Sequence, residues 1–174
     1  MKTLIALFLV ILVVPADMYA QGEPGSGQHS LGVAAELSVP VGDFSSLAGI
    51  GYGGMAKYQY GVDPRTAMTV SAGYLVWSKT DLVGGTIQPK AFEAMFGGKY
   101  YFAPGFFGSL EGGVYILSYT REGEVIGVEG DTWRFMLPIG VGYQMNGFEI
   151  GARYYIFNVN ANSFSFTLGY NWTL

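Results

Sequence analysis

Eight charged residues are the side chains of this sequence best placed for chemistry, because each lies on the polar side of an alternating run. They are Glu36, Lys57, Glu93, Lys99, Glu111, Arg134, Glu149 and Arg153. Acids and bases in equal number can neutralise one another as ion pairs, relay protons or line a polar conduction path. Which of these the chain uses depends on the elements that hold them.

Catalysis by a nucleophile and base is poorly supported. The only histidine, His29, is followed by Ser30 but precedes the first alternating run, so we interpret this pair as incidental. The absence of cysteine, with a single histidine, excludes a metal site built from those residues. A carboxylate-only site stays open. No phosphate-binding loop is present, and we predict no enzymatic activity and no cofactor.

The remaining charge is mostly acidic, which gives the chain a net charge of −4. One connection carries a net negative set of charges that could bind a divalent cation or a basic partner, although a solvated loop is the simpler interpretation. These charges are Arg121, Glu122, Glu124, Glu129 and Asp131. The basic stripe that nucleic-acid binding requires is absent.

Apolar and polar residues alternate in about eight runs, which predicts strands with one apolar and one polar face. The predicted strands are Leu31–Val39, Ile50–Tyr60, Thr66–Trp77, Pro89–Phe102, Phe107–Tyr119, Thr132–Met145, Phe148–Phe157 and Ser163–Leu174. Proline lacks a ladder donor, so Pro138 within the sixth run predicts a bulge or a bend. The strands form a single domain, residues 31–174.

The connections between these runs alternate long and short. The long ones are Pro40–Gly49, Ser78–Gln88, Thr120–Asp131 and Asn158–Asn162, and the short ones are Gly61–Arg65, Ala103–Phe106 and Asn146–Gly147. This alternation is typical of an all-β, eight-stranded, antiparallel up-and-down transmembrane barrel. Asn-Gly favours a type I′ turn, which pairs Met145 with Phe148 and Gln144 with Glu149.

The N-terminus and the composition favour export to a membrane. Lys2, the apolar stretch Leu4–Val14 and Pro15 predict a signal peptide over residues 1–20, followed by a flexible lead-in over residues 21–30. Charged residues make up 13% of the chain, against about 25% in soluble domains, while 50% are hydrophobic. A lipid bilayer explains both values if the apolar faces contact lipid.

An eight-stranded barrel is just wide enough for side chains to fill it. The eight polar-face charges are therefore expected to pair inside as a structural plug, with Lys99 and Glu111 as partners across the turn that joins their strands. Conduction or a proton relay is the functional alternative.

Aromatic side chains cluster near the short turns and predict a girdle at the membrane–water interface. They are Tyr58, Tyr60, Tyr100, Phe102, Tyr143, Phe148, Tyr170 and Trp172. Phe107 is close to them in sequence but has inward parity. The alternative is an ordinary aromatic core in a soluble barrel.

The last strand resembles the terminal signal by which barrel-assembly machinery recognises outer-membrane proteins. Its residues are Thr167, Gly169, Trp172 and Leu174, although Leu174 replaces the usual terminal aromatic. The stretch Leu37–Gly54 (LSVPVGDFSSLAGIGYGG) resembles the first strand, loop and second strand of small, porin-like outer-membrane β-barrel proteins. This resemblance implies a bacterial outer-membrane barrel with lipid and the assembly machinery as partners. That family includes anchors, adhesins and narrow channels.

Three functions follow from these patterns. The first is a non-enzymatic outer-membrane protein whose long loops contact an unidentified surface partner. The second is a narrow channel for small or hydrophobic solutes. The third is a soluble periplasmic barrel that turns its apolar face inward around a ligand.

Overall fold

The computed structural model describes residues 25–46, 48–82, 85–121, 124–126, 133–157 and 162–174. The signal peptide predicted for residues 1–20 lies outside these ranges. Eight long strands make up most of the described chain: β1 (His29–Pro40), β2 (Gly51–Asp63), β3 (Thr66–Trp77), β5 (Gly85–Ala103), β6 (Phe106–Arg121), β8 (Trp133–Met145), β9 (Phe148–Phe157) and β10 (Ser163–Thr173).

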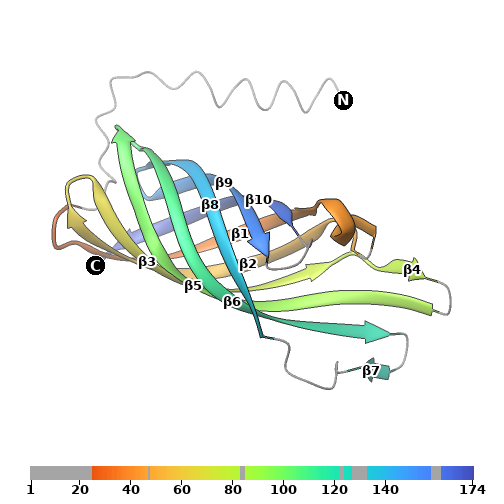
Figure 1. The fold of residues 1–174 in the computed structure, drawn as a ribbon. Coiled ribbons are helices and arrows are strands. Elements are labelled where there is room, and N and C mark those ends of the chain that lie inside the picture. Colours follow the sequence, from red (N-terminus) through yellow and green to blue (C-terminus); the bar gives the residue numbers. More distant parts are fainter. Residues whose placement is uncertain (1–24, 47, 83–84, 122–123, 127–132, 158–161) are drawn as a thin grey trace.

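These eight strands form a closed antiparallel ring. Each pairs with the strands on either side of it, and β1 pairs with both β2 and β10, which closes the sheet into a barrel (Figure 1). The predicted eight-stranded antiparallel barrel is therefore confirmed. Closure leaves no open sheet edge, so each long strand finds backbone hydrogen-bond partners on both sides.

Three short elements lie at the end of the barrel that carries the long connections. Strands β4 (Thr80–Leu82) and β7 (Glu124–Ile126) pair with β5 and β6 and continue these hairpins beyond the barrel (Figure 1). A 3₁₀ helix, η1 (Gly42–Ser46), follows β1 at the same end. The sequence predicted only loops here, because a three-residue strand is too short to show alternation.

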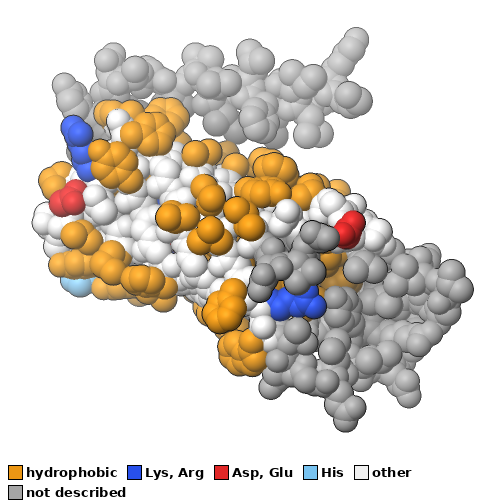
Figure 2. Space-filling view, viewed as in Figure 1, with side chains coloured by type: hydrophobic (Ala, Val, Ile, Leu, Met, Phe, Trp, Pro, Cys, Tyr) orange, Lys and Arg blue, Asp and Glu red, His pale blue; other side chains and the backbone are white. Residues whose placement is uncertain are grey.

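Side-chain direction follows the predicted alternation. In β1, Leu31, Val33 and Leu37 are exposed, whereas Glu36 and Ser38 are buried. Hydrophobic side chains cover much of the flank of the barrel that Figure 2 shows, and charged side chains lie toward its two ends. No helix in the described ranges is long and apolar enough to cross a membrane.

Pro138 interrupts the β6–β8 ladder without shifting its register. It pairs with Tyr155 of β9, and the β6–β8 register is the same on both sides, from Leu110–Ile139 to Gly113–Met136. The two residue pairs between these points do not join the β6–β8 ladder, since proline has no N–H to donate. Of the bulge or bend predicted at Pro138, the bulge is absent, because the register does not shift there. Register shifts occur instead beside two tight turns, between Gly61 and Asp63 and between Tyr101 and Ala103.

The turn at Asn146 and Gly147 has the predicted geometry. Both residues have positive φ values, 50° and 83°, as a type I′ turn requires. Met145 pairs with Phe148, and Gln144 pairs with Glu149. This turn therefore sets the β8–β9 register and directs Glu149 into the barrel.

Gly147→Ala should destabilise the barrel by about 1–3 kcal/mol. A Cβ at Gly147 would lie 2.7 Å from the carbonyl oxygen of Asn171, on a backbone that L-residues rarely adopt. Urea unfolding in lipid vesicles measures the loss. Gly112→Ala is the matched control, because a Cβ there meets nothing within 4 Å. Equal unfolding midpoints for the two variants would contradict the assigned turn.

Candidate functional site

The inward faces of the strands carry most of the charges singled out from the sequence. Seven of these side chains are buried, whereas Arg134 is half-buried near the start of β8: the buried ones are Glu36, Lys57, Glu93, Lys99, Glu111, Glu149 and Arg153. Three levels of this interior can be distinguished along the barrel. The first level lies nearest the tight turns, and the third lies nearest the long connections.

The first level is organised by Glu149 of β9. Its Oε2 accepts from Lys57 Nζ at 2.5 Å, from Lys99 Nζ at 2.6 Å and from Asn171 Nδ2 at 3.0 Å. These residues come from four strands, so one carboxylate oxygen connects β2, β5, β9 and β10. Charge-assisted hydrogen bonds of this kind are among the strongest in proteins.

Neutral groups complete the first level. Lys99 Nζ also donates to Gln59 Oε1 at 3.1 Å and lies 4.2 Å from the centre of the Phe107 ring. Gln59 Nε2 donates to Tyr101 Oη, and Tyr101 Oη donates to Gln144 Oε1. The ammonium of Lys99 therefore has an anion, an amide oxygen and an aromatic face around it, which compensates for its lost hydration.

The second level pairs Arg153 of β9 with Glu111 of β6. The distance from Nη2 to Oε2 is 3.4 Å, and Thr69 Oγ1 donates to the other carboxylate oxygen at 3.0 Å. Lys99 binds Glu149, so the expected partnership of Lys99 with Glu111 is wrong. These two residues sit on adjacent strands, but β5 residue Gly97, not Lys99, is level with Glu111.

The third level holds two carboxyl groups with no ion pair among the described residues. Glu36 Oε1 accepts from Tyr155 Oη at 3.1 Å and also from Ser165 Oγ. Glu36 Oε2 and Glu93 Oε1 are buried without a hydrogen-bond partner. This level therefore differs from the other two, where each carboxylate has a cation.

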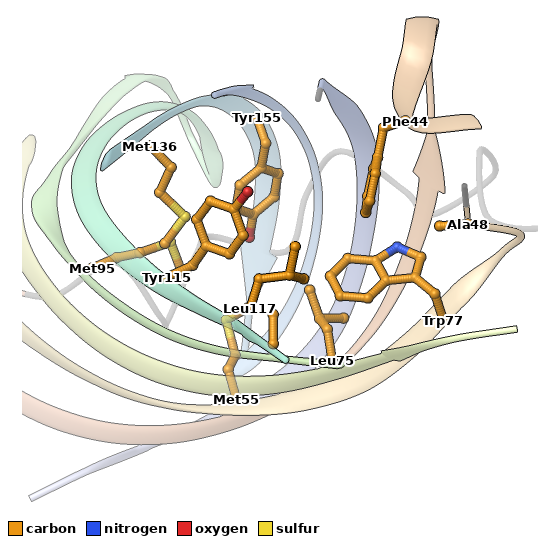
Figure 3. Close-up of a cluster of buried hydrophobic side chains, with 11 residues drawn as sticks. Phe44, Ala48, Met55, Leu75, Trp77, Met95, Tyr115, Leu117, Met136 and Tyr155 are labelled. Carbon is orange, nitrogen blue, oxygen red and sulfur yellow. The ribbon is translucent and has the colours of Figure 1, made fainter. Parts of the chain in front are cut away.

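An apolar cluster lies above the third level. Phe44 of η1 packs edge-on against Trp77 with ring centres 5.4 Å apart, and Tyr115, Tyr155 and Leu117 project into the same interior (Figure 3). At the opposite end Tyr101 and Phe107 pack together, with ring centres 5.7 Å apart. Side chains therefore occupy the lumen from one end to the other.

This cluster was not predicted from the sequence. The inward parity of Trp77, Tyr115 and Tyr155 was available from the alternation, but their convergence on η1 was not. Phe44 belongs to η1, in the connection between β1 and β2. Because Phe44 is buried, η1 covers this end of the barrel.

The aromatic residues singled out from the sequence lie on the outer face near the tight-turn end. Tyr60, Tyr100, Phe102, Phe148 and Trp172 are exposed, and Tyr58, Tyr143 and Tyr170 are half-buried. Several contact one another: Tyr170 lies 4.9 Å from Phe148 and 5.1 Å from Trp172 between ring centres. Phe107 is buried inside, in agreement with its inward parity.

His29 and Ser30 do not form a nucleophile–base pair. Both lie on β1, so they are part of the barrel and not of the predicted flexible lead-in. His29 is exposed and its Nδ1 lies 2.5 Å from Tyr58 Oη, whereas Ser30 is buried on the other face. Within the described ranges, no group of three or more metal-binding side chains comes together.

The remaining predicted residues belong to the C-terminal strand and to the acidic connection. In β10, Thr167 faces inward and is buried, Gly169 pairs with Ala34 of β1, and Trp172 is exposed. Leu174 follows the strand, and its N–H donates to the carbonyl of His29 at 2.9 Å. Of the acidic connection, Glu122, Glu129 and Asp131 lie outside the described residues.

Comparisons with known proteins identify the fold. No protein-family model and no curated protein matches the sequence. Among solved structures, Ail, the attachment invasion locus protein of Yersinia pestis, is 18% identical with a TM-score of 0.58, covering 84% of this chain and 99% of Ail. The outer membrane protein OprG from Pseudomonas aeruginosa is 13% identical with a TM-score of 0.54, covering 87% and 98%. The chain has the fold of a small outer-membrane β-barrel.

A designed protein shares this fold as well. A de novo transmembrane β-barrel is 14% identical with a TM-score of 0.51, covering 87% of this chain and 99% of the design. At these sequence identities, the likeness to the solved structures concerns the fold alone.

Glu149→Gln should destabilise the β-barrel by about 3–5 kcal/mol, because two buried ammonium groups lose their shared anion. Urea unfolding in vesicles measures the effect. A second substitution, Lys99→Met, should recover part of the loss by removing one unpaired charge. If Glu149→Gln alone lowered the free energy of unfolding by less than about 1 kcal/mol, the central position of Glu149 would be contradicted.

Proposed function

We propose that this chain is an integral, non-enzymatic protein of the bacterial outer membrane whose barrel anchors surface loops. The observation that carries the proposal is the outward apolar surface. Phe96, Leu110, Val141 and Leu168 lie on four different strands and are 54–62% exposed. In water, a continuous apolar surface around a whole barrel would drive aggregation, whereas in a bilayer it contacts lipid.

A soluble barrel with an inward apolar face is not compatible with this arrangement. Most of the large apolar side chains of the described strands point outward, and seven buried charged side chains point inward. That alternative is therefore wrong. The aromatic side chains near the tight turns support the membrane assignment, because amphipathic rings favour the interface between lipid and water.

The filled lumen favours an anchoring role for the barrel over a role as a channel. Ion pairs occupy the first two levels of the interior, and the apolar cluster with Phe44 and Trp77 covers the end with the long connections. A solute would have to displace buried and mutually bonded side chains to pass. The internal charges then act as a structural plug.

The loops are the proposed contact surface. Ail is named for attachment and invasion, and it has also been solved in complex with the heparin analogue sucrose octasulfate, in a structure with a TM-score of 0.57 to this chain. This supports a surface role for a barrel of the same shape. The net negative charge of the connection that carries Arg121, Glu122, Glu124, Glu129 and Asp131 would suit a basic partner or a divalent cation, although a solvated loop is the simpler interpretation.

Export and assembly are part of the proposal. The signal peptide over residues 1–20 would direct secretion, and the terminal strand with Thr167, Gly169, Trp172 and Leu174 would be recognised by the assembly machinery. The β1–β10 pairing supports this role, because the last strand must find the first one before the barrel closes.

Phe96→Arg should destabilise the barrel by about 2–4 kcal/mol in lipid vesicles, since it places a charge at the centre of the lipid face. Phe96 pairs with Val70, near the middle of β3. Phe102→Arg is the matched control near the end of β5 and should cost about 0–1 kcal/mol. Urea unfolding of both variants measures the difference. Equal and negligible costs would reject a transmembrane barrel.

In a planar bilayer, the purified protein should give no reproducible conductance steps. Heating in detergent should shift its gel mobility, which shows that the sample tested was a folded barrel. Lys99→Met should alter the unfolding midpoint and leave the conductance unchanged. Discrete steps in the wild type that change with Lys99→Met would instead support the channel.

A further inference from the structure

Glu36 of β1 and Glu93 of β5, here called the carboxyl pair, are buried at the third level of the lumen, with exposed fractions of 4% and 3%. Their strands are separated in the sheet by β2 and β3. Glu93 pairs with Gly73 of β3, and a Cβ added to Gly73 would lie 2.7 Å from Glu93 Oε1. The Glu93 side chain therefore extends over β3, in the direction of β2 and β1.

Glycines leave room for the carboxyl pair on both intervening strands. Glu36 pairs with Gly53 of β2, as Glu93 pairs with Gly73 of β3. Neither glycine has a side chain that would fill the lumen between β1 and β5. The two carboxyl groups consequently lie within hydrogen-bond distance of each other.

The contact within the carboxyl pair has no donor. Glu36 Oε2 and Glu93 Oε1 are buried, and no described group donates a hydrogen bond to either of them. The other oxygen of Glu36 accepts from Tyr155 Oη at 3.1 Å and from Ser165 Oγ. Ionised carboxylates only accept hydrogen bonds, so two of them in contact repel each other. One proton on either group would supply the donor that this contact requires.

The bases near the carboxyl pair are not bonded to it. Arg153 is paired with Glu111, and Arg134 is level with Glu93 but has Tyr115 between them in the register. In the part of the chain that the structure describes, no ion pair joins either arginine to the carboxyl pair. Strands β3 and β10 present glycine, serine and threonine at this level. The nearest titratable groups on the other strands are Lys57 (β2), Glu111 and Tyr115 (β6), Arg134 (β8), and Arg153 and Tyr155 (β9).

We propose that Glu36 and Glu93 form a proton-binding site, in which one proton is held between the two carboxyl groups at neutral pH. The proton belongs to the pair and not to either residue alone. It connects β1 with β5 across the lumen, at the level where the ion pairs end. This site goes beyond the proposed anchoring role and does not depend on it.

The site makes the stability of the barrel depend on pH in one direction. In the unfolded chain both carboxyl groups are exposed to water and ionised at neutral pH, whereas the folded barrel retains one proton. Unfolding then releases this proton, so stability falls as the pH rises. Glu93→Gln places a permanent amide donor against Glu36, and this part of the pH dependence should disappear.

Infrared spectroscopy of the folded protein in lipid vesicles tests for the proton directly. A protonated carboxyl group has a C=O stretching band that an ionised carboxylate lacks. We expect this band in the wild type at neutral pH, and we expect Glu93→Gln to lose it. Asp43→Asn removes an exposed carboxyl group at the same end of the barrel and should retain the band. A heat-dependent shift in gel mobility shows that each variant is folded.

Urea unfolding in vesicles is the second measurement. Between neutral and alkaline pH, the unfolding midpoint of the wild type should fall further than that of Glu93→Gln. The titration of lysine and tyrosine side chains at alkaline pH affects both proteins, so the difference between them reports the carboxyl pair. Equal falls in the two midpoints would contradict the proposal.

Three infrared results would also overturn it. A wild type without a protonated-carboxyl band would show that both groups are ionised, and this result requires no variant to fold. A band that persists in folded Glu93→Gln would place the proton on another group. A band that is absent from the wild type but appears in Arg134→Gln would show that Arg134 neutralises Glu93 in place of a proton.

Discussion

Closure of the β1–β10 seam is the constraint on which the rest of this structure depends. Once β1 pairs with β10, every long strand has two neighbours. The backbone N–H and C=O groups of the strands then find hydrogen-bond partners without water. The same closure divides the side chains into two separate environments. Alternation along each strand then decides which residues contact lipid and which must share a narrow lumen.

The narrow lumen accounts for the internal charges. With eight strands there is room for side chains but little for water, so a charged group inside needs a partner on another strand. Glu149 provides one for Lys57 and Lys99, and Glu111 provides one for Arg153. These contacts cross the barrel and join strands that are not hydrogen-bonded to each other, such as β5 and β9. They therefore support the barrel shape as well as neutralise charge.

The interior changes in character along its length. Charge compensation is complete at the first two levels, towards the tight turns, and stops at Glu36 and Glu93, where an aromatic wall begins. Towards the long connections the lumen is therefore filled by aromatic and apolar side chains and not by ion pairs.

The sequence alone determined the strands, their two faces, the order of long and short connections and the β8–β9 register. These are local properties: alternation has a period of two, and the turn at Asn146 and Gly147 places its neighbours directly. The same parity correctly indicated that Glu36, Lys57 and Arg153 face inward. Pro138 showed the limit of local reasoning, since its effect depended on whether β6 and β8 could keep their register around a missing donor. Only the tertiary structure decided which charges meet, because that depends on the stagger of strands around the closed ring. Lys99 therefore contacts Glu149, 50 positions away, and not Glu111 on the next strand. The burial of Phe44 over Trp77 arises in the same way, from elements that approach one another only after closure.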